Sequence, residues 1–325
     1  MSTQSEFSLI ETYFTDLTDS RDDVILGIGD DCALLQCPAD QLAAVSIDTL
    51  VEGIHFFADV DPESLGHKSL AVGLSDLAAM GAKPAWFTLA LTLPESNESW
   101  LKAFSQGLAT LAKQHNIQLV GGDTTKGPLT ISIQVHGFVK SEQALRREGA
   151  QIGDLIYVSG SLGDAGAALQ LKLKQWNDEA LSTQDKEYLN KRLEKPTPRV
   201  EFGQKLLEFA TSAIDISDGL SSDLGHILKK SNVGATVELS KLPFSSALQR
   251  ISQTKAVDFA LNSGDDYELC FTIPADKQEL FESIVDGEYI HVGVIEADLG
   301  LRILGLDGQK HTITGSGYDH FVTNS

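Results

Sequence analysis

The chain has 325 residues, of which 42% are hydrophobic, and this length favours two domains with substantial apolar cores. Its 46 acidic and 25 basic side chains give a formal charge of −21 at pH 7. Such a charge argues against a nucleic-acid or anionic-membrane partner, and an anionic small substrate would need cations beside it. No apolar run approaches the roughly 18 residues of a membrane span, and no signal-peptide pattern opens the chain, so we expect a cytoplasmic protein.

The first part of the chain predicts strands that alternate with helices. Apolar residues spaced three and four apart predict a short helix over 7–18. Pro62 follows a capping Asp61 and predicts the start of a helix that continues to Gly81, and a second helix is expected over about 98–115. Short apolar runs predict strands over 24–28, 42–48, 86–93 and 130–139.

A charged segment, 140–153, interrupts this pattern and predicts a hinge between one domain at 1–140 and another at 150–325. Beyond the hinge a rough order of strand and helix returns, without a convincing sequence repeat. Helices are predicted over 164–175, 200–211 and 219–230. Strands are predicted over 154–159, 234–239, 268–273 and 291–295.

Aspartates stand where apolar runs end, and they are the most informative feature of the sequence. Short apolar runs bounded by Gly and Asp predict buried strands, and active sites of α/β folds gather at the carboxyl ends of such strands. Asp76 adds a carboxylate inside an otherwise apolar helix, which is an unfavourable position for aspartate. Asp76 lies with Ser69 and Gly73 on a small polar face of this helix. The aspartates at run ends are Asp30, Asp31, Asp48, Asp123, Asp215 and Asp218.

Each of these aspartates alone also has a structural explanation. Asp31 and Asp123 could shape turns after glycines, and Asp218 could cap the helix predicted over 219–230. Two like charges about 4 Å apart repel by about 4 kcal/mol at an effective dielectric near 20, so converging carboxylates require protons or metal ions. Oxygen ligands favour a hard cation, and Mg²⁺ completed by phosphate oxygens is typical of phosphoryl-transfer sites. Jointly, the aspartates therefore predict a Mg²⁺ cluster.

Other signatures of phosphate chemistry are absent or weak. The chain contains no Walker A motif and no G-x-S-x-G elbow. The Gly-rich turn at 160–166 could bind phosphate at a helix N-terminus, but a tight strand–helix turn is the favoured interpretation. His55 could touch a substrate or pack beside Phe56, Arg147 suits phosphate binding, and Tyr318 could stack on a heteroaromatic ligand. The three cysteines have neither CxxC nor zinc spacing, and we expect them to be buried.

Six motifs, in order along the chain, are similar to those of the thiamine-monophosphate kinase family. They are GIGDDCA at 27–33, DTLVEGIHF at 48–56, LSDLAAMG at 74–81, GGDTT at 121–125, IDISDGL at 214–220 and DYEL at 266–269. The resemblance runs over nearly the whole chain, from about Phe7 to Phe321. The competing interpretations are another ATP-using enzyme of the same superfamily and a non-catalytic Ca²⁺-binding module, although no EF-hand spacing is present.

The resemblance implies an α+β, two-domain fold like that of aminoimidazole ribonucleotide synthetase. The N-terminal domain, 1–140, would bind metal and ATP and form a dimeric β-barrel, and 150–325 would form a C-terminal α/β sandwich domain. The implied reaction is the ATP- and Mg²⁺-dependent phosphorylation of thiamine monophosphate to thiamine diphosphate, the last step of thiamine diphosphate biosynthesis, in a cytoplasmic homodimer. We expect direct in-line transfer without a general base, because the attacking phosphate is already largely ionised.

The resemblance also implies roles for individual residues. The implied metal ligands are Asp31, Ser46, Ile47, Asp48, Asp76, Asp123, Asp215 and Asp218. The implied nucleotide-binding residues are Gly122, Asp123, Arg147 and Ser217. The implied substrate-binding residues are His55, Asp265 and Tyr318. Two positions depart from the family's usual residues, since Ile47 replaces Thr and offers only a backbone carbonyl, and Asp265 is one methylene shorter than the usual Glu.

Overall fold

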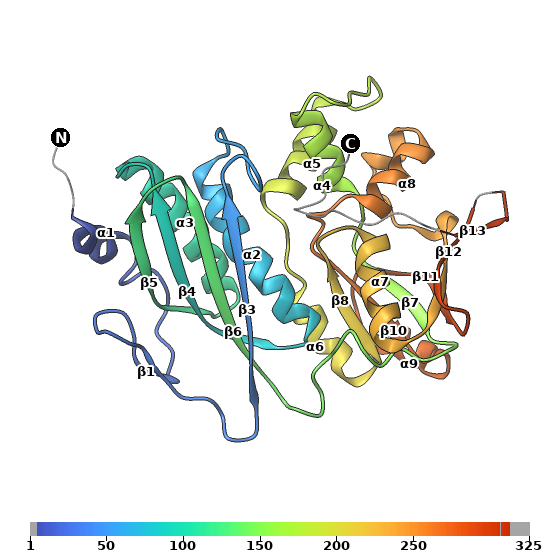
Figure 1. Cartoon of the computed structure of the whole chain (residues 1–325), viewed down its shortest axis with the longest axis horizontal. Coiled ribbons are helices and arrows are strands. Elements are labelled where there is room, and N and C mark those ends of the chain that lie inside the picture. Colours follow the sequence, from blue (N-terminus) through green and yellow to red (C-terminus); the bar gives the residue numbers. More distant parts are fainter. Residues whose placement is uncertain (1–4, 306, 313–325) are drawn as a thin grey trace. The chain divides into compact units, whose positions relative to one another are not determined.

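The structure is a computed structural model of the chain, and it describes residues 5–305 and 307–312 (Figure 1). Two compact units are present, one formed by the chain up to Leu77 with Ala82–Ala144 and the other by Ala78–Gly81 with the chain from Leu145 onward. Each unit is built around its own sheet. No helix in the described ranges is long and apolar enough to cross a bilayer.

The sheet of the first unit has the strand order β3-β6-β4-β5. The β3–β6 and β6–β4 pairs are antiparallel, and β4–β5 is parallel. Strand β6 coincides with the strand predicted over 130–139, whereas β3 and β4 extend beyond the strands predicted over 42–48 and 86–93, and β5 continues past the apolar run before Asp123, because backbone pairing does not depend on apolar side chains. The strands are β3 (Leu42–Val51), β6 (Thr130–Val139), β4 (Lys83–Leu93) and β5 (Gln118–Lys126).

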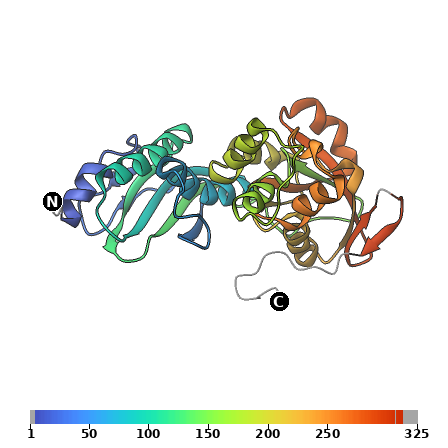
Figure 2. The same ribbon diagram turned by 90° about the horizontal axis from the view of Figure 1, so that it is seen from above.

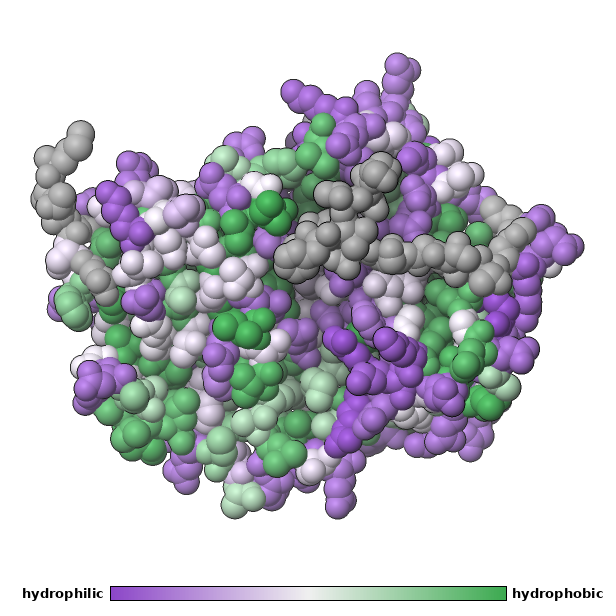
Figure 3. All heavy atoms as spheres, in the orientation of Figure 1, coloured by the Kyte–Doolittle hydropathy of each residue, from purple (hydrophilic) through white to green (hydrophobic). Residues whose placement is uncertain are grey.

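Two long helices, α2 (Pro62–Ala79) and α3 (Glu98–Gln114), cover one face of this sheet (Figures 1 and 2). Glycine permits their close approach, because a Cβ at Gly107 would lie 1.9 Å from the Glu63 carbonyl oxygen. The opposite face carries a short antiparallel pair, β1 (Val24–Leu26) and β2 (Leu34–Leu35), packed near Trp86. Figure 3 looks onto this opposite face, where hydrophobic residues lie among polar ones.

The second unit contains a mixed sheet in the order β13-β12-β9-β11-β7-β10-β8. The β12–β9 pair is parallel and the other pairs are antiparallel. The strands are β7 (Leu155–Ser159), β8 (Ser212–Ile216), β9 (Gly234–Glu238), β10 (Glu268–Ile273), β11 (Tyr289–Glu296), β12 (Gly300–Leu304) and β13 (Lys310–Thr312).

Both faces of this second sheet are covered, and strand alternation explains how. Ile156 and Val158 of β7 belong to a core with α7 (Leu220–Ser231), whereas Tyr157 between them stacks on Phe271 on the other face. That other face is aromatic and includes side chains from α6 (Val200–Lys205) and α9 (Gln278–Ile284). A further cluster joins α4 (Asp164–Lys172), α5 (Thr183–Glu194) and α8 (Gln253–Asn262).

Several elements differ from the sequence-based expectations. Helix α1 (Glu6–Tyr13) ends well before residue 18, and the helix expected over 200–211 is α6 followed by a 3₁₀ turn at Leu206–Glu208. Helix α5 was not predicted, because its sequence is mostly polar. The expectation of buried cysteines is wrong for Cys32 and Cys37, which are exposed.

Candidate active site

Ser46, Asp48 and Asp76 form a polar contact on the helix-covered face of the first sheet. Alternation along β3 places Ser46 and Asp48 on the same face of the strand, and Ile47 between them is 62% exposed on the other. Asp76 comes from α2, where the neighbouring leucines are buried. The Ser46 hydroxyl donates a hydrogen bond of 2.5 Å to Oδ2 of Asp76. Residues 30 positions apart in sequence thus present three oxygen groups at one place.

The pKa of Asp48 is shifted within this contact. Burial raises the pKa of Asp48 to about 7, and the negative charge of Asp76 and a hydrogen bond shared with it add to the effect. Two carboxylates this close are stable together when they share a proton or bind a cation. Carboxylate and hydroxyl oxygens are hard ligands that suit Mg²⁺, which usually takes one or two carboxylates and completes its shell with water and phosphate.

The expectation that the aspartates lie at strand ends is wrong for the first sheet. Asp48 pairs with Ile133 in the interior of β3, and Asp123 pairs with Ala90 in the interior of β5. The strands continue because ladder hydrogen bonds come from the backbone and do not depend on the polarity of the side chain. Both acidic groups therefore project from the faces of the sheet rather than from its edge, Asp48 toward the helices and Asp123, which pairs with exposed Ala90, from the opposite face.

Asp123 lies far from Asp48 within one chain. Asp48 is in register with Ile133, which is in register with Leu89, and Leu89 is in register with Gly122. Three strand spacings of about 4.8 Å separate β3 from β5, so the two aspartates lie roughly 14 Å apart along the sheet. One Mg²⁺ cannot contact both carboxylates of the same chain.

Gly122 and Asp31 both lie at exposed backbone in this unit. A Cβ at Gly122 would lie 1.9 Å from the Leu89 carbonyl oxygen, so the close approach of β4 requires glycine there. Asp31 is exposed, and its N–H donates to Oδ1 of Asp30 at 2.8 Å. Asp30 therefore performs the turn-forming role, while the carboxylate of Asp31 is accessible from solvent.

His55 lies just past the end of β3 in a tight turn. The ring Nδ1 of His55 accepts a hydrogen bond of 3.0 Å from the Val51 backbone N–H, and the backbone N–H of His55 donates to the Val51 carbonyl. These two contacts fix the ring and place the proton of the neutral imidazole on Nε2. Phe56, the next residue, is buried.

A second acidic group lies at the end of β8 in the second unit. Asp215 is buried within β8, and Ser217 and Asp218 follow the strand. The N–H groups of Ser217 and Asp218 donate to Oδ2 of Asp223 at 3.1 and 3.0 Å. The pKa of Asp223 is raised to about 7, mainly by burial and also by the charge of Asp218, while the two backbone hydrogen bonds and the charge of Arg147 oppose the rise. Arg147 therefore lies near this acidic segment, with its side chain exposed.

Asp265 lies in a strained turn that is attached to the same strand end. Asp265 and Tyr267 adopt positive φ angles of 68° and 51°. The Asp265 N–H donates to the Ser217 carbonyl at 2.9 Å, and the Tyr267 N–H donates to the Ile216 carbonyl at 2.8 Å. Asp265 is half-buried, and the Tyr267 hydroxyl donates to its Oδ1 at 2.9 Å.

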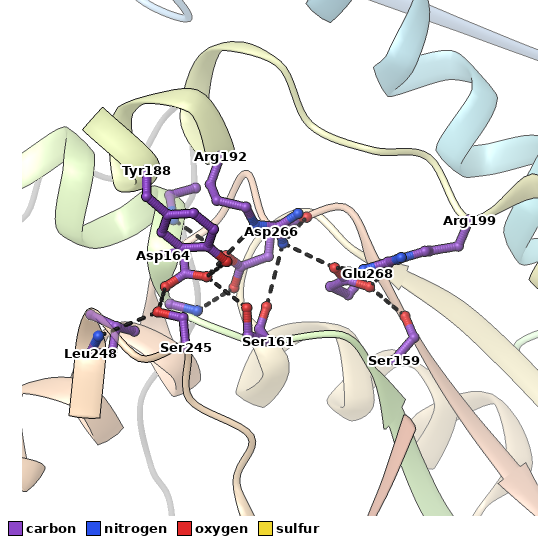
Figure 4. A network of polar contacts seen from close by, with 12 residues as sticks. Ser159, Ser161, Asp164, Tyr188, Arg192, Arg199, Ser245, Leu248, Asp266 and Glu268 are labelled. Carbon is purple, nitrogen blue, oxygen red and sulfur yellow. Dashed lines mark hydrogen bonds and ion pairs between the residues drawn. The ribbon is translucent and has the colours of Figure 1, made fainter. Parts of the chain in front are cut away.

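A buried ionic network lies beside this turn (Figure 4). Glu268 is fully buried and receives two hydrogen bonds of 2.6 Å from the Arg199 guanidinium, one of 2.9 Å from Arg192 and one of 2.6 Å from the Ser159 hydroxyl. A carboxylate without solvent requires such partners, because an unpaired buried charge is strongly destabilising. The network fixes the first residue of β10 relative to α5 and β7.

The Gly-rich turn at 160–166 is a structural turn, as favoured from the sequence. The buried carboxylate of Asp266 occupies the start of α4, accepting from Gly163 N–H at 2.6 Å and more weakly from Ala165 N–H at 3.4 Å. A phosphate would use these same donors. Burial raises the pKa of Asp266 well above its usual range.

The structure brings some of the candidate residues together and separates others. Ser46, Asp48 and Asp76 meet in the first unit, and Arg147, Ser217, Asp218 and Asp265 gather near the end of β8 in the second. Within residues 5–305 and 307–312, no three His, Cys, Asp or Glu side chains are grouped as a metal site. Tyr318 lies outside the described residues.

Sequence reasoning missed several residues that shape these sites. Asp223, Arg192, Arg199 and Glu268 are buried or half-buried charges whose partners lie on other elements. The one available signal was the charge of Glu268 at the start of an apolar run. Its partner Arg199 is 69 residues away, and no local pattern connects the two.

Comparisons with known proteins agree with this architecture. The model of the AIR synthase related protein N-terminal domain matches residues 29–139, and the model of the corresponding C-terminal domain matches residues 151–304. These matches define the chain as an AIR synthase related protein of two domains. A crystal structure of HypE, a hydrogenase maturation protein of E. coli, shares the fold at a TM-score of 0.75 and 22% identity, over 94% of this chain and 95% of that chain.

Closer relatives share one description. The thiamine-monophosphate kinase of Escherichia coli strain K12 is 50% identical over 98% of both chains, and that of Bacillus subtilis is 34% identical over 97% of this chain and 99% of its own. The crystal structure of the Stenotrophomonas maltophilia enzyme has a TM-score of 0.82 at 50% identity, covering 89% of this chain and 92% of that one. A structure of AaThiL complexed with AMPPCP and TMP has a TM-score of 0.77 at 29% identity, covering 88% and 89%. The chain belongs to the thiamine-monophosphate kinase family.

Proposed function

We propose that this protein transfers the γ-phosphoryl group of ATP to thiamine monophosphate in a Mg²⁺-dependent reaction that forms thiamine diphosphate, the last step of its biosynthesis. The contact between Asp48 and Asp76 carries the proposal, because two adjacent carboxyls, with the pKa of Asp48 raised by burial and by its neighbour, are suited to a hard cation. The complex of AaThiL with AMPPCP and TMP supports the choice of an ATP donor and a thiamine monophosphate acceptor.

The residues divide into three proposed roles. The metal ligands are Asp31, Ser46, Ile47, Asp48, Asp76, Asp123, Asp215 and Asp218, with Ile47 acting through its carbonyl because its side chain is apolar. The nucleotide would contact Gly122, Asp123, Arg147 and Ser217. Thiamine monophosphate would contact His55, Asp265 and Tyr318. When bound, Mg²⁺ would screen the two phosphates from each other and stabilise the charge of the transition state.

The protein itself would act by binding and orientation rather than by proton transfer. The terminal phosphate of thiamine monophosphate is already largely ionised near neutral pH, so its oxygen attacks the γ-phosphorus in line without a general base. The fixed ring of His55, with its proton on Nε2, suits hydrogen bonding to an anionic or polar group of the substrate. The exposed guanidinium of Arg147 suits the phosphates of ATP.

A cytoplasmic homodimer would complete the site, with residues 1–140 binding metal and ATP and forming the dimer and 150–325 forming the C-terminal domain. The sheet face opposite α2 and α3 supports this, because hydrophobic residues lie on its surface (Figure 3). Val45 and Ile47 of β3 are 52% and 62% exposed. Two such faces packed together would form a closed β-barrel. The roughly 14 Å between Asp48 and Asp123 of one chain suggests that Asp123 serves the site of the partner.

A coupled assay with ATP, Mg²⁺ and thiamine monophosphate tests the proposed reaction. We expect thiamine diphosphate and ADP in equal amounts, and chelation of Mg²⁺ should abolish both. Asp48→Asn should lose most activity, while Asp40→Asn, at an exposed turn before β3, should keep it. If the wild-type protein forms no thiamine diphosphate at any Mg²⁺ concentration, the proposed function is wrong.

A further inference from the structure

The turn from Gly264 to Tyr267 is held in a conformation that its side chains disfavour. Left-handed backbone is costly for residues other than glycine, asparagine and aspartate, and Tyr267 adopts it at a φ of 51°. Asp265 adopts it too, at 68°. Strain of this kind persists where surrounding contacts over-determine the backbone, and it clusters at functional sites.

Three sets of contacts hold the turn in place. The N–H groups of Asp265 and Tyr267 donate to consecutive carbonyls of the β8 end, at Ser217 and Ile216. Gly264 lies so close that a Cβ there would be 2.1 Å from the Ser217 carbonyl oxygen. Asp266 is anchored between these residues by its bond to the Gly163 N–H (Figure 4).

Beyond the turn, the chain is held by the ionic network. Glu268 follows Tyr267 directly and accepts hydrogen bonds from Arg199 and Arg192. Arg192 also donates a hydrogen bond of 3.4 Å to the Asp266 carbonyl. Asp266 and Glu268 are each at most 1% exposed. Both neighbours of Tyr267 are therefore immobilised, and Tyr267, only 8% exposed, has little freedom to move away from Asp265.

The side chain of Tyr267 ends on the carboxylate of Asp265. Its hydroxyl donates to Oδ1 at 2.9 Å, across only two residues, and both residues are left-handed. This bond selects one rotamer of a side chain that is half-buried and accessible from solvent. A pre-ordered carboxylate loses less conformational entropy when a ligand binds.

We infer that Tyr267 is a positioning residue, whose hydroxyl orients the Asp265 carboxylate toward the thiamine moiety of the substrate. The inference rests on the proposed function, in which Asp265 contacts thiamine monophosphate. Tyr267 itself does not touch the reacting phosphates, so its contribution concerns the binding of the acceptor. The ionic network around Glu268 fixes the backbone beside Tyr267, so that the Tyr267 hydroxyl and the Asp265 carboxylate stay within hydrogen-bond distance.

Tyr267→Phe removes the hydroxyl and keeps the ring, so the packing of the turn is preserved. We expect the KM for thiamine monophosphate to rise about 3- to 10-fold, the range expected for one hydrogen bond, with kcat and the KM for ATP within about twofold of wild type. Tyr289→Phe is the matched control, because the Tyr289 hydroxyl donates to a backbone carbonyl, that of Val285, away from Asp265. It should leave all three constants unchanged.

A double-mutant cycle with Asp265→Gly separates positioning from general destabilisation. Glycine adopts the left-handed conformation without strain, so this background should fold. If Tyr267 acts through Asp265, adding Tyr267→Phe to Asp265→Gly should change the KM for thiamine monophosphate no further. Calorimetric binding of thiamine monophosphate without ATP should show the same pattern.

The outcomes distinguish this inference from the proposed function. Additive effects in the cycle, or an unchanged KM in Tyr267→Phe, would overturn the positioning role while wild-type activity stands. An equal rise in the KM for ATP and thiamine monophosphate in Tyr267→Phe would also overturn it, since that pattern reports general disruption. A wild-type protein that forms no thiamine diphosphate would instead refute the proposed function itself.

Discussion

A mixture of two inactive variants should recover activity if each site is built from two chains. Asp48→Asn removes a proposed metal ligand from β3, and Asp123→Asn removes one from β5. Within one chain these strands are separated by β6 and β4, which places the two strands roughly 14 Å apart. Each pure variant carries the same defect in both sites of its dimer and should be inactive.

The recovered activity can be calculated from symmetry. When equal amounts of the two variants exchange subunits, about half of the dimers are mixed, and each mixed dimer has one doubly substituted site and one intact site. The mixture should therefore regain about a quarter of wild-type activity. The assay measures thiamine diphosphate after co-refolding or co-expression, with differently tagged chains isolated in tandem to verify mixed dimers.

The structure supplies a matched control for this experiment. Asp48 and Asp76 lie in contact within one unit, so a mixture of Asp48→Asn with Asp76→Asn leaves every site with one defect and should stay inactive. Mixed dimers of Asp48→Asn and Asp123→Asn that show no more activity than this control would refute the shared site. Restoration in both mixtures would show that the contact between Asp48 and Asp76 is not a functional unit.

Three further results are expected. Asp76→Asn should lower kcat/KM by more than about a hundredfold, because even outer partners of metal ligands contribute 10- to 100-fold, and steady-state kinetics at saturating Mg²⁺ would measure it. Asp265→Ala should be less stable to urea than Asp265→Gly by about 1 kcal/mol, because φ at this position is 68°; equal stabilities would mean that the turn relaxes. Burial lowers the pKa of His136 below its usual 6.5, so the unfolded chain takes up a proton on His136 more readily than the folded chain does. The free energy of unfolding should therefore fall as the pH drops through 6.5. In His136→Gln the loss of unfolding free energy between about pH 7 and 5 should be smaller, as urea titrations at both pH values would show.

Apolar periodicity predicted the elements that form continuous cores. Helix α2 begins at Pro62 and ends two residues before the predicted stop at Gly81, because capping chemistry and an apolar face coincide there. Helix α5 escaped prediction because only Leu189 and Leu193 on its face are buried apolar residues, and its start depends on a capping box between Ser182 and Asp185. The strand interiors at Asp48 and Asp123 escaped as well, since a polar side chain does not interrupt backbone pairing.

The acidic residues were identifiable, but their arrangement was not. Asp76 was informative from the sequence because aspartate is unfavourable inside an apolar helix, so its presence there indicates a specific role. The structure pairs it with Asp48. The network around Glu268 joins residues 69 and 76 positions apart, which no local pattern encodes. The separation of Asp48 from Asp123 depends on strand order, which the sequence alone did not define.

The ionic network around Glu268 adds little net stability, because desolvation of buried ions offsets most of their attraction. Its consequence is positional, since a bidentate guanidinium fixes both the location and the plane of the carboxylate that it binds. Glu268 opens β10 directly after the strained turn, so its fixation prevents the turn from relaxing into the strand. The left-handed conformations of Asp265 and Tyr267 can persist only under such constraint. Buried charge and backbone strain at this place are therefore two parts of one arrangement that holds the Asp265 carboxylate still.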